Sequence, residues 1–575
     1  MKKLLTLTSL AVLLAACGGP KGPRAFTYAT SGELTGLDPD LAYDGDTQGL
    51  LYNVYETLIA FEGETNDKIV PKLATDVPTR ENGGIGKDGR TYRFPIRKGV
   101  KFHDGRELTP DDVRYSLLRF MLTDRDGGPS SLLLEPILGL TGTRDKDGKL
   151  KVAYAEAAKA VTVDGDAVVV RLKQPFGPFL AIMARWSYVV SRSWCKEKGD
   201  WDGEEKGWEK FNNLKADDSK LFAEANGTGP FRVERWDRVG RRIILGRHAG
   251  YWRAPAALER VVQLAVPEFA TRRLLLQGGD ADIIATPRPL LSQVEGVKGV
   301  VVRDGLPRLL TDPSLFFTFK INPSGNPDIG SGKLDGEGIP PDFFADRDVR
   351  KGFAYSFDYD ALLNDTFKGK AARAVSSIPP GLAFRDAAAP HYDHDLKRAE
   401  AHFKKAWGGR VWEKGFRFTL TYNTGGDTRE AACQILKKNV ESLNPKFRVD
   451  VRGVEWAAFL DKAQRKLMPL FARGWTGDYP DAHNFAFPFY HRDGRYPSAQ
   501  GYADATFDSL VEKAVREVDP KKRAALYSDI AKRAYEEVPS LLTVHPAGVY
   551  AMREDVQGFV DNAVLMGVDF YPLHR

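Results

Sequence analysis

The sequence predicts an α/β protein built from two or three compact units. Its 575 residues are too many for a single hydrophobic core. A composition of 42% hydrophobic and 28% charged residues is typical of a soluble globular protein. Residues 418–422 and 447–451 have the pattern of strands, and residues 429–441 between them have that of a helix. This order predicts layers of helices around a partly parallel sheet.

Residues 90–120 carry the strongest local pattern in the chain. Tyr92 and Phe94 alternate with polar residues, which predicts a strand with one buried face. Further on, Thr109 is a favourable helix N-cap, and Pro110 suits the first helical position. Thr109 and Asp112 have the spacing of a capping box. We therefore expect a strand, turns and a capped helix that runs to Phe120.

This segment resembles the signature of the family 5 extracellular solute-binding proteins, the peptide-binding receptors of ABC importers. The family pattern is roughly T-Y-x-F-x-L-R-x-G-V-x-F-H-D-G-x-x-L-T-x-x-D-V, and this chain departs from it at Pro95-Ile96. Further resemblances follow in order over nearly all of the remaining chain, including Tyr55-Glu56-Thr57-Leu58, Pro71-Lys72-Leu73-Ala74 and Gly227-Thr228-Gly229-Pro230-Phe231.

The resemblance implies an α/β, two-lobed fold like that of periplasmic binding proteins, with an extra subdomain in the first lobe. Mixed sheets with flanking helices and a hinge between the lobes are expected. Residues 26–285 plus 541–575 are assigned to lobe I, with a subdomain at about 62–200, and residues 286–540 to lobe II. Residues 199–225 are interpreted as an insertion. The alternative is that Trp201 and Trp208 in this segment form a surface that binds a partner.

The N-terminus predicts export. Lys2 and Lys3, an apolar run and small residues before Cys17 form a secretory signal in residues 1–16. Leu14-Ala15-Ala16-Cys17 resembles a bacterial lipobox, which implies that Cys17 is lipidated and that residues 17–25 form a tether. The alternative is an ordinary signal peptide with a chance cysteine. With the anchor, the protein is expected in the periplasm or on the outer face of the cytoplasmic membrane.

Charge and cysteine content narrow the class further. A net charge of +6 on so large a chain, with no nucleic-acid-binding motif, does not indicate nucleic acid as a partner. Cys195 and Cys433 give no metal-ligand spacing, and either a disulfide or two free buried thiols fits them. We expect a monomer without cofactor or metal.

A secreted enzyme is the chief alternative to a binding protein. The common nucleophile, zinc-protease, P-loop and dinucleotide motifs do not occur. Asp111 and Asp112 are explained by helix capping, and His103 by a hydrogen bond within its turn. A weak cluster remains, which capping and solvated surface explain more simply than metal binding: His391, Asp393, His394, Asp395 and His402. No catalytic residue is therefore assigned.

The stretch at residues 473–485 is a stronger candidate for a functional site than these segments. Glycines on both sides of Trp475 allow close backbone approach, and Asp478 follows the end of a predicted strand, where α/β lobes present ligand groups. The stretch resembles the family's G-W-x-x-D-Y pattern, which places Gly477 and Tyr479 beside the carboxylate. By that resemblance Asp478 pairs with the α-ammonium of a peptide. The alternative is that Asp478 only caps a turn.

Other ligand contacts follow from the same resemblance. Trp456 and Trp475 are expected to line side-chain pockets, or else to belong to the core. The remaining expected contacts are the Tyr422-Asn423 pair, which resembles the oligopeptide-binding Y-N-T pattern, Arg429 and Arg473 for a C-terminus, and Thr47 and Gln48 for an extended backbone.

These expectations make the chain an extracytoplasmic binding protein that captures oligopeptides between two closing lobes and delivers them to the permease subunits of an ABC importer. Two alternatives stay open. Another solute of the family, such as a nickel chelate, haem, an oligosaccharide or an opine, is the first. A secreted peptidase or glycosidase is the second.

Overall fold

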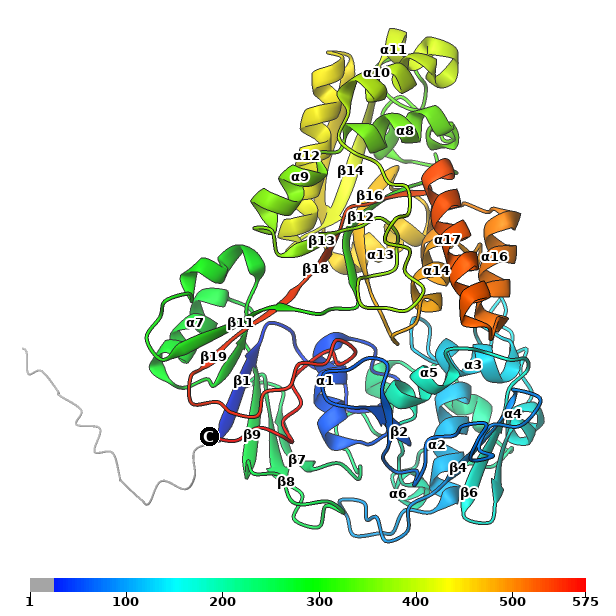
Figure 1. Ribbon diagram of the computed structural model, residues 1–575, viewed down its shortest axis with the longest axis vertical. Coiled ribbons are helices and arrows are strands. Elements are labelled where there is room, and N and C mark those ends of the chain that lie inside the picture. Colours follow the sequence, from blue (N-terminus) through cyan, green and yellow to red (C-terminus); the bar gives the residue numbers. More distant parts are fainter. Residues whose placement is uncertain (1–24) are drawn as a thin grey trace, which may run out of the picture.

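The computed structural model describes residues 25–575 and has two lobes, one above the other in Figure 1. The expected signal and the lipidation residue Cys17 lie outside the described residues. The two-lobed α/β fold expected from the sequence is confirmed.

The first lobe is organised around a seven-stranded mixed sheet, in the order β11-β19-β10-β1-β9-β8-β7. The strand β1 lies between β9 and β10 and is parallel to both, while the other neighbours pair antiparallel. The strands are β1 (Phe26–Thr30), β7 (Phe231–Asp237), β8 (Arg242–Arg247), β9 (Arg260–Ala265), β10 (Ile283–Ala285), β11 (Val300–Leu306) and β19 (Gly548–Arg553). This sheet is accompanied by α1 (Gly45–Val54) and α7 (Phe269–Gly278).

A subdomain of the same lobe contains the segment with the strongest local pattern. The sheet β4-β6-β5 is antiparallel, and β4 is the strand expected from the alternation. The expected capping box is confirmed, because Thr109 and Asp112 bond each other's backbone at the start of α2. The elements are β2 (Ile59–Phe61), β3 (Ile69–Pro71), β4 (Thr91–Pro95), α2 (Pro110–Leu122), α3 (Ser131–Leu138), α4 (Tyr154–Ala160), β5 (Val161–Asp164), β6 (Ala167–Arg171), α5 (Phe179–Trp186) and α6 (Arg192–Glu197).

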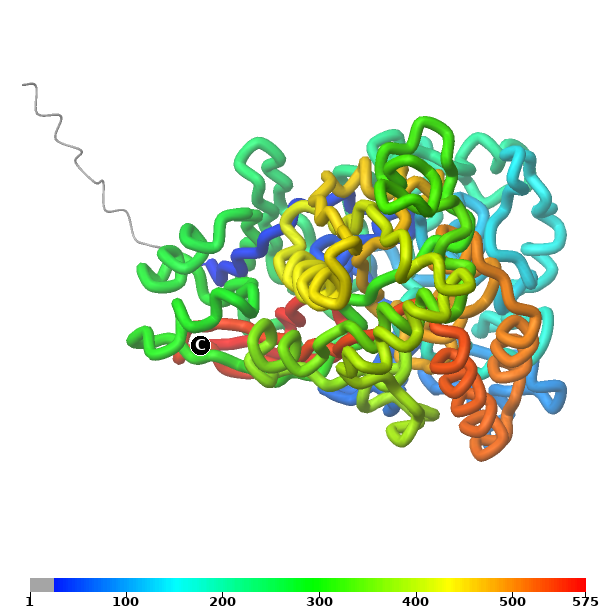
Figure 2. Tube along the Cα trace, turned by 90° about the horizontal axis from the view of Figure 1, so that it is seen from above, coloured from blue at the N-terminus to red at the C-terminus, as the bar shows by residue number. Residues whose placement is uncertain are grey.

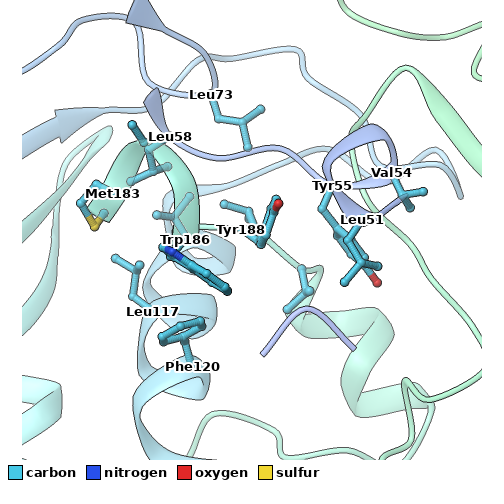
Figure 3. Packing of buried hydrophobic residues seen from close by; sticks show 14 of the residues in the cluster. Leu51, Val54, Tyr55, Leu58, Leu73, Leu117, Phe120, Met183, Trp186 and Tyr188 are labelled. Carbon is cyan, nitrogen blue, oxygen red and sulfur yellow. The ribbon is translucent and has the colours of Figure 1, made fainter. Parts of the chain in front are cut away.

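The core of this lobe joins the subdomain to the elements of the large sheet. Figure 3 shows part of it, where Trp186 lies beside Leu117 and Phe120 of α2. Trp186 is 1% exposed, and burying an aromatic ring of this size contributes about 2–3 kcal/mol to folding. This burial fixes the end of α5, and with it the wall that the first lobe presents to the second.

The insertion at residues 199–225 belongs to this core. Trp201 and Trp208 are both buried, and Trp201 lies 5.6 Å from Tyr115 of α2, measured between ring centroids. The alternative that these two tryptophans form a partner surface is therefore wrong. The insertion contains only short 3₁₀ turns, at Trp208–Phe211 and Ala216–Asp218.

The second lobe holds a five-stranded sheet in the order β15-β14-β16-β12-β17. As expected, part of it is parallel, since β14 pairs in parallel with both β15 and β16. The strands are β12 (Leu310–Phe317), β14 (Phe416–Asn423), β15 (Phe447–Val454), β16 (Leu470–Thr476) and β17 (Ser540–Leu542), and a separate pair is β13 (Ala371–Arg373) with β18 (Val544–Pro546).

Helices cover both faces of this sheet. They are α8 (Arg347–Ser356), α9 (Tyr359–Ala361), α10 (Leu396–Lys405), α11 (Arg410–Lys414), α12 (Asp427–Leu443), α13 (Trp456–Gln464), α14 (His483–Tyr490), α15 (Arg495–Gln500), α16 (Ala505–Arg516) and α17 (Pro520–Glu537). The helix α10 is capped by Asp395, whose side chain accepts from the N–H of Arg398. Figures 1 and 2 place α16 and α17 at the same end of the molecule as the first-lobe subdomain.

The chain crosses between the lobes at points that differ from the expected boundaries. The strand β11 pairs with β19 in the first sheet, so the first crossing lies at residues 307–309 and not near residue 286. On the return, β17 and β18 still pair with second-lobe strands, which puts the second crossing at Ala547 instead of 541. The boundaries of the lobes are set by pairing between strands that are far apart in the sequence. The local sequence pattern does not predict such pairing.

Candidate functional site

A cavity of about 510 Å³ lies between the lobes and is lined by both of them. Its walls come from α3 and the preceding loop on one side, and from β16, α13 and α14 on the other. Among its lining residues are Tyr43, Arg125, Glu135, Trp456, Arg473, Trp475, Asp478, Tyr479, His483, Asn484, Phe487 and Arg495. Five of the predicted ligand residues thus meet in one cavity.

Asp478 is held at this cavity by groups from both lobes. Its Oδ1 accepts from the hydroxyl of Tyr43 at 2.8 Å, and its backbone N–H donates to Oδ1 of Asn484 at 2.8 Å. The indole Nε1 of Trp186 donates to the backbone carbonyl of Asp478 at 2.8 Å. Tyr43 and Trp186 belong to the first lobe, so the carboxylate lies where the two lobes meet.

The charge of Asp478 has no partner within the described chain. The side chain is 4% exposed, and among residues 25–575 no basic group forms an ion pair with it. Burial raises the pKa of this carboxyl group to about 6, although the hydrogen bonds of Tyr43 and Asn484 and the charge of Arg185 act to lower it. A buried carboxylate costs folding free energy unless a cation compensates it, so this position favours a cationic ligand group.

Arg185 supports this wall from within the first lobe. Its guanidinium is 1% exposed, stacks 4.8 Å from the ring of Trp186, and donates from Nη1 to Oε1 of Gln48 and to the hydroxyl of Tyr188. Its Nε and Nη2 are buried without a hydrogen-bond partner among residues 25–575. Arg185 therefore places a positive charge behind Trp186, the residue that bonds the backbone of Asp478.

Arg473 and the two tryptophans form the other part of the cavity. The guanidinium of Arg473 lies 5.2 Å above the ring of Trp456, and no carboxylate of residues 25–575 pairs with it. Burial lowers the pKa of Arg473, and the charge of Arg495 acts in the same direction. Trp456 is 43% exposed, so part of its side chain is available to a ligand, whereas Trp475 is half-buried and donates to Asn484.

Gly474 and Gly477 allow the backbone of this stretch to lie close to neighbouring residues, as the sequence predicted. A β-carbon at Gly477 would lie 2.7 Å from Cζ of Phe485, and one at Gly474 would lie 2.4 Å from Cβ of Asp312. The backbone N–H of Gly477 also donates to the carbonyl of Leu309. Gly477 is buried and shapes the loop without lining the cavity, while Tyr479 next to it is buried against the core of the first lobe.

The predicted contacts on β14 and α12 lie elsewhere. Arg429 makes a two-pronged ion pair with Asp312, at 2.8 and 3.0 Å, and also donates to Oδ1 of Asn423. Its charge is therefore compensated inside the protein. Tyr422 is half-buried against the second-lobe core. None of these residues lines the cavity between the lobes.

Thr47 and Gln48 are also bonded internally. Both are fully buried; Thr47 Oγ1 accepts from the N–H of Thr35, and the Gln48 side chain bonds the carbonyl of Ala42 and the guanidinium of Arg185. Neither lines the cavity. Their polar groups hold the loop that carries Tyr43, so we do not include them among the proposed ligand contacts.

Several cavity residues were not found from the sequence. Tyr43, Glu135, His483, Asn484 and Arg495 stand in segments without a distinctive motif, and tertiary packing alone brings them to Asp478. Only His483 and Asn484 could have been found from the sequence, because both lie in the 473–485 stretch. Nε2 of His483 lies 3.3 Å from Oε1 of Glu135, which adds a polar contact across the lobes.

The groups weighed for other chemistry have structural contacts. His103 has a structural role, but its two ring nitrogens contact Gly227 and Gly229 and not its own turn, and burial lowers its pKa to about 3. His391, His394 and His402 each lie nearest a different carboxylate, those of Asp393, Asp358 and Asp348. Within residues 25–575 no group of three potential ligands gathers around a metal-sized space.

Cys195 and Cys433 are buried free thiols, so of the two alternatives the structure has the unpaired one. Burial raises the pKa of both thiols. A search of the helices within residues 25–575 finds none with the length and apolar character of a membrane span.

Two lobes that line a common cavity are typical of binding proteins of the periplasmic type. Residues 68–497 match the family described as bacterial extracellular solute-binding proteins, family 5 Middle, and the chain belongs to this family. The dipeptide-binding protein of Escherichia coli is 24% identical and the alignment covers 93% of this chain and 92% of that protein. The oligopeptide-binding protein OppA of Bacillus subtilis is also 24% identical, with 97% of each chain covered.

Solved structures show the same fold. DppA of Helicobacter pylori, determined in complex with the peptide STSA, superposes with a TM-score of 0.74 at 22% identity, covering 96% of this chain and 98% of that one. The expected family membership is thus confirmed over most of the chain.

Proposed function

We propose that this protein is the substrate-binding component of an ABC importer and captures peptides with a free amino terminus between its two lobes. The relatives named above bind dipeptides and oligopeptides, and this supports the same ligand class here. The observation that carries the proposal is the buried carboxylate of Asp478, which faces the cavity without a cation of its own.

A peptide's α-ammonium supplies the missing charge. It would offer a charge-assisted hydrogen bond to the carboxylate, and this bond is strong in a buried site. Tyr43 and Asn484 already hold the carboxylate in one orientation, so little conformational entropy is lost on binding. An N-acetylated peptide lacks the charge and is expected to bind poorly.

The far part of the cavity suits the rest of such a ligand. The uncompensated guanidinium of Arg473 is a partner for a ligand carboxylate, and the exposed part of Trp456 offers a contact surface for varied side chains. Arg473 and Asp478 are five positions apart along and beyond β16, a separation of at most about 17 Å at the rise of a strand. A zwitterionic peptide of a few residues bridges such a distance.

Closure of the lobes is the expected mechanism of capture. The contacts of Asp478 with Tyr43 and Trp186, and of His483 with Glu135, all join one lobe to the other. They form only when the lobes meet, so a ligand that pairs with Asp478 favours the closed state by its additional contacts there.

The remaining parts of the proposal concern place and partners. An extracytoplasmic location accords with the family, and a lipid anchor at Cys17 would keep the protein at the membrane, next to the permease subunits that receive the ligand. We propose a monomer that releases its ligand unchanged and catalyses no reaction on it.

The first test identifies the ligand. Protein purified without denaturation is to be analysed by mass spectrometry of the small molecules it releases on unfolding. Peptides with free amino termini are the expected result. Recovery of haem, a nickel chelate or a sugar in their place would refute the peptide assignment while leaving the binding-protein class intact.

The second test addresses the anchor. Asp478→Asn is expected to weaken the binding of a released peptide about 100-fold, because a buried charge pair loses one partner. Asp461→Asn on α13 is the matched control, since Asp461 is exposed and pairs only with Arg465. Equal affinity of the Asp478 variant and the control, measured by isothermal titration calorimetry, would show that the anchor is wrong.

The third test separates binding from turnover. The protein is to be incubated with a peptide mixture for hours and the mixture analysed again. We expect stoichiometric retention without products. Cleavage in proportion to protein concentration would instead favour the hydrolase alternative.

A further inference from the structure

A second cavity, of about 540 Å³, lies wholly within the first lobe. Its walls are the β2–β3 hairpin, the segment around Trp252 and the C-terminal residues 560–572. None of its lining residues lines the cavity between the lobes. The charged and aromatic side chains that matter below are Tyr52, Lys72, Trp252, Arg253, Asp569 and Tyr571.

The ammonium group of Lys72 faces this cavity without a hydrogen-bond acceptor. Its side chain is only 12% exposed, and the nearest carboxylate oxygen within residues 25–575, Oε1 of Glu56, is 3.9 Å from Nζ. Glu56 is fully buried and already accepts from Thr228, Tyr251 and Trp252 at 2.8 to 2.9 Å. The carboxylate is thus saturated by neutral donors, and the three N–H bonds of Lys72 stay available.

Other donors converge on the same space. The guanidinium of Arg253 lies 5.0 Å above the ring of Tyr571, and no carboxylate within residues 25–575 forms an ion pair with it. The hydroxyl of Tyr52, whose ring lies 4.6 Å below Nζ of Lys72, has no hydrogen-bond partner in that part of the chain either. Two acids also line this cavity. Glu62 pairs with Lys68, while Asp569 accepts the N–H of Tyr571; burial raises the pKa of Asp569, and the charges of Lys72 and Arg253 act to lower it. The groups without a hydrogen-bond partner among residues 25–575 are nevertheless donors, those of Lys72, Arg253 and Tyr52, and they call for a ligand with acceptor oxygens.

The walls between these donors are flat and aromatic. Trp252 is half-buried, its Nε1 is fixed by Glu56, and Arg97 lies 4.5 Å from the ring. The hydroxyl of Tyr571 is fixed by the carbonyl of Ala254. Rings held in this way present rigid faces on which a planar group can stack at little cost in conformational entropy.

We propose that this cavity is a second ligand site, which binds a planar or aromatic molecule that carries an oxyanion. Lys72 and Arg253 would pair with the oxyanion, the hydroxyl of Tyr52 would donate to it, and Trp252 and Tyr571 would hold the ring. The oxyanion belongs to a carboxylate or to a phosphate ester, and the two differ in charge and size.

Benzoate and phenyl phosphate are the probes that distinguish these sources, and benzyl alcohol is the neutral control. Titration followed by calorimetry, with the change in tryptophan fluorescence as a second readout, is expected to show binding of one or both anions and none of the alcohol. Preference for benzoate assigns a carboxylate, and preference for phenyl phosphate assigns a phosphate. Absence of binding for both at millimolar concentration would overturn the proposal.

Variants locate the binding. Lys72→Met is expected to weaken the bound anion at least tenfold, and Lys72→Arg to retain most of the affinity. Lys98→Met is the matched control, because Lys98 is exposed, its ion pair is with Asp166, and neither residue lines the cavity. Tyr52→Phe serves as a second variant if Lys72→Met does not fold, with an expected loss of about tenfold for one hydrogen bond to a charged acceptor.

The two sites can be tested apart. Asp478→Asn is expected to leave anion binding unchanged, so failure of the peptide proposal and failure of this one give different results. Equal anion affinity in the wild type, Lys72→Met and Tyr52→Phe would place the probe elsewhere and refute the assignment.

Discussion

Two regions of this molecule arrange their buried charges in opposite ways. In the first lobe the guanidinium of Arg119 donates to Asp38, Asp40 and Asp200 at 2.6 to 2.8 Å, and all four side chains are at most 3% exposed. Between the lobes, Asp478 and Arg473 have no ion-pair partner among residues 25–575. Burial of charge is common to both regions, whereas compensation within the chain occurs only in the first.

The comparison indicates how a structural charge cluster differs from a ligand site. Arg119 joins α2 to the loop at residues 38–40 and to the insertion at Asp200, so its hydrogen bonds close three segments on one another. Asp478 and Arg473 keep their charges at the wall of a cavity. A buried charge without a partner lowers the free energy of unfolding. A ligand of opposite charge removes this cost when it binds, so the same free energy contributes to its affinity.

The largest effect is expected from breaking the compensated cluster. Arg119→Met leaves three carboxylates buried without a cation, and we expect a loss of about 3–5 kcal/mol in the free energy of unfolding. Urea denaturation followed by circular dichroism measures it. Arg106→Met is the control, because the exposed pair of Arg106 with Glu197 contributes at most about 1 kcal/mol. A similar small loss in both variants would contradict the structural role of the cluster.

Removal of the uncompensated charge of Asp478 is expected to raise the free energy of unfolding, whereas Arg119→Met lowers it. The pKa of Asp478 is raised to about 6 in the folded state from about 3.9 in the unfolded chain, so above pH 6 its ionisation disfavours folding. Asp478→Asn is therefore expected to stabilise the ligand-free protein at pH 8, by up to about 3 kcal/mol, while it weakens peptide binding. Thermal unfolding of both forms checks this, and a destabilised variant would mean that Asp478 is a structural residue.

A smaller effect is expected at the other charge. Arg473→Met should weaken a peptide with a free carboxyl terminus about 10- to 30-fold, because one charge-assisted hydrogen bond is lost. The C-terminal amide of the same peptide should bind the variant and the wild type alike. Calorimetry of wild type and Arg473→Met, each with the acid and the amide form of the peptide, isolates the interaction of Arg473 with the terminal carboxylate. An equal loss of affinity for acid and amide would exclude this pairing.

The smallest effect is a dependence on pH. Below pH 6 Asp478 takes up a proton in the empty cavity, so peptide affinity is expected to fall up to tenfold per pH unit, while the ligand's α-ammonium stays charged. The groups that act on this carboxyl group are Tyr43, Asn484 and Arg185, and Glu135 and Asp481 act on the neighbouring Tyr479.

The pH experiment has an internal control. Titrations between pH 5 and 7.5 should give the same slope for wild type and Arg473→Met, since Arg473 stays charged throughout this range. A slope that persists in Asp478→Asn would assign the titration to another group.

Local pattern determined the parts of the fold that are made by neighbours in sequence. The strand at β4, the capping box of Thr109 and Asp112, and the close approach of Gly477 all follow from residues within a few positions of one another. Resemblance then placed the chain in its family and singled out Asp478. Trp456 and Arg473 were also predicted, and both line the cavity between the lobes.

Tertiary structure decided what depends on distant partners. Arg429 and Arg473 look equivalent in the sequence, yet Asp312 forms its ion pair with Arg429 and not with Arg473. Gln48 was expected at the ligand, but it bonds Arg185 from another helix. Tyr43 reaches Asp478 only because the two lobes meet there. The sequence thus determined which charges the protein carries and where its helices begin, and the meeting of the lobes decided which charges remain uncompensated, because pairing depends on distances that local pattern does not encode.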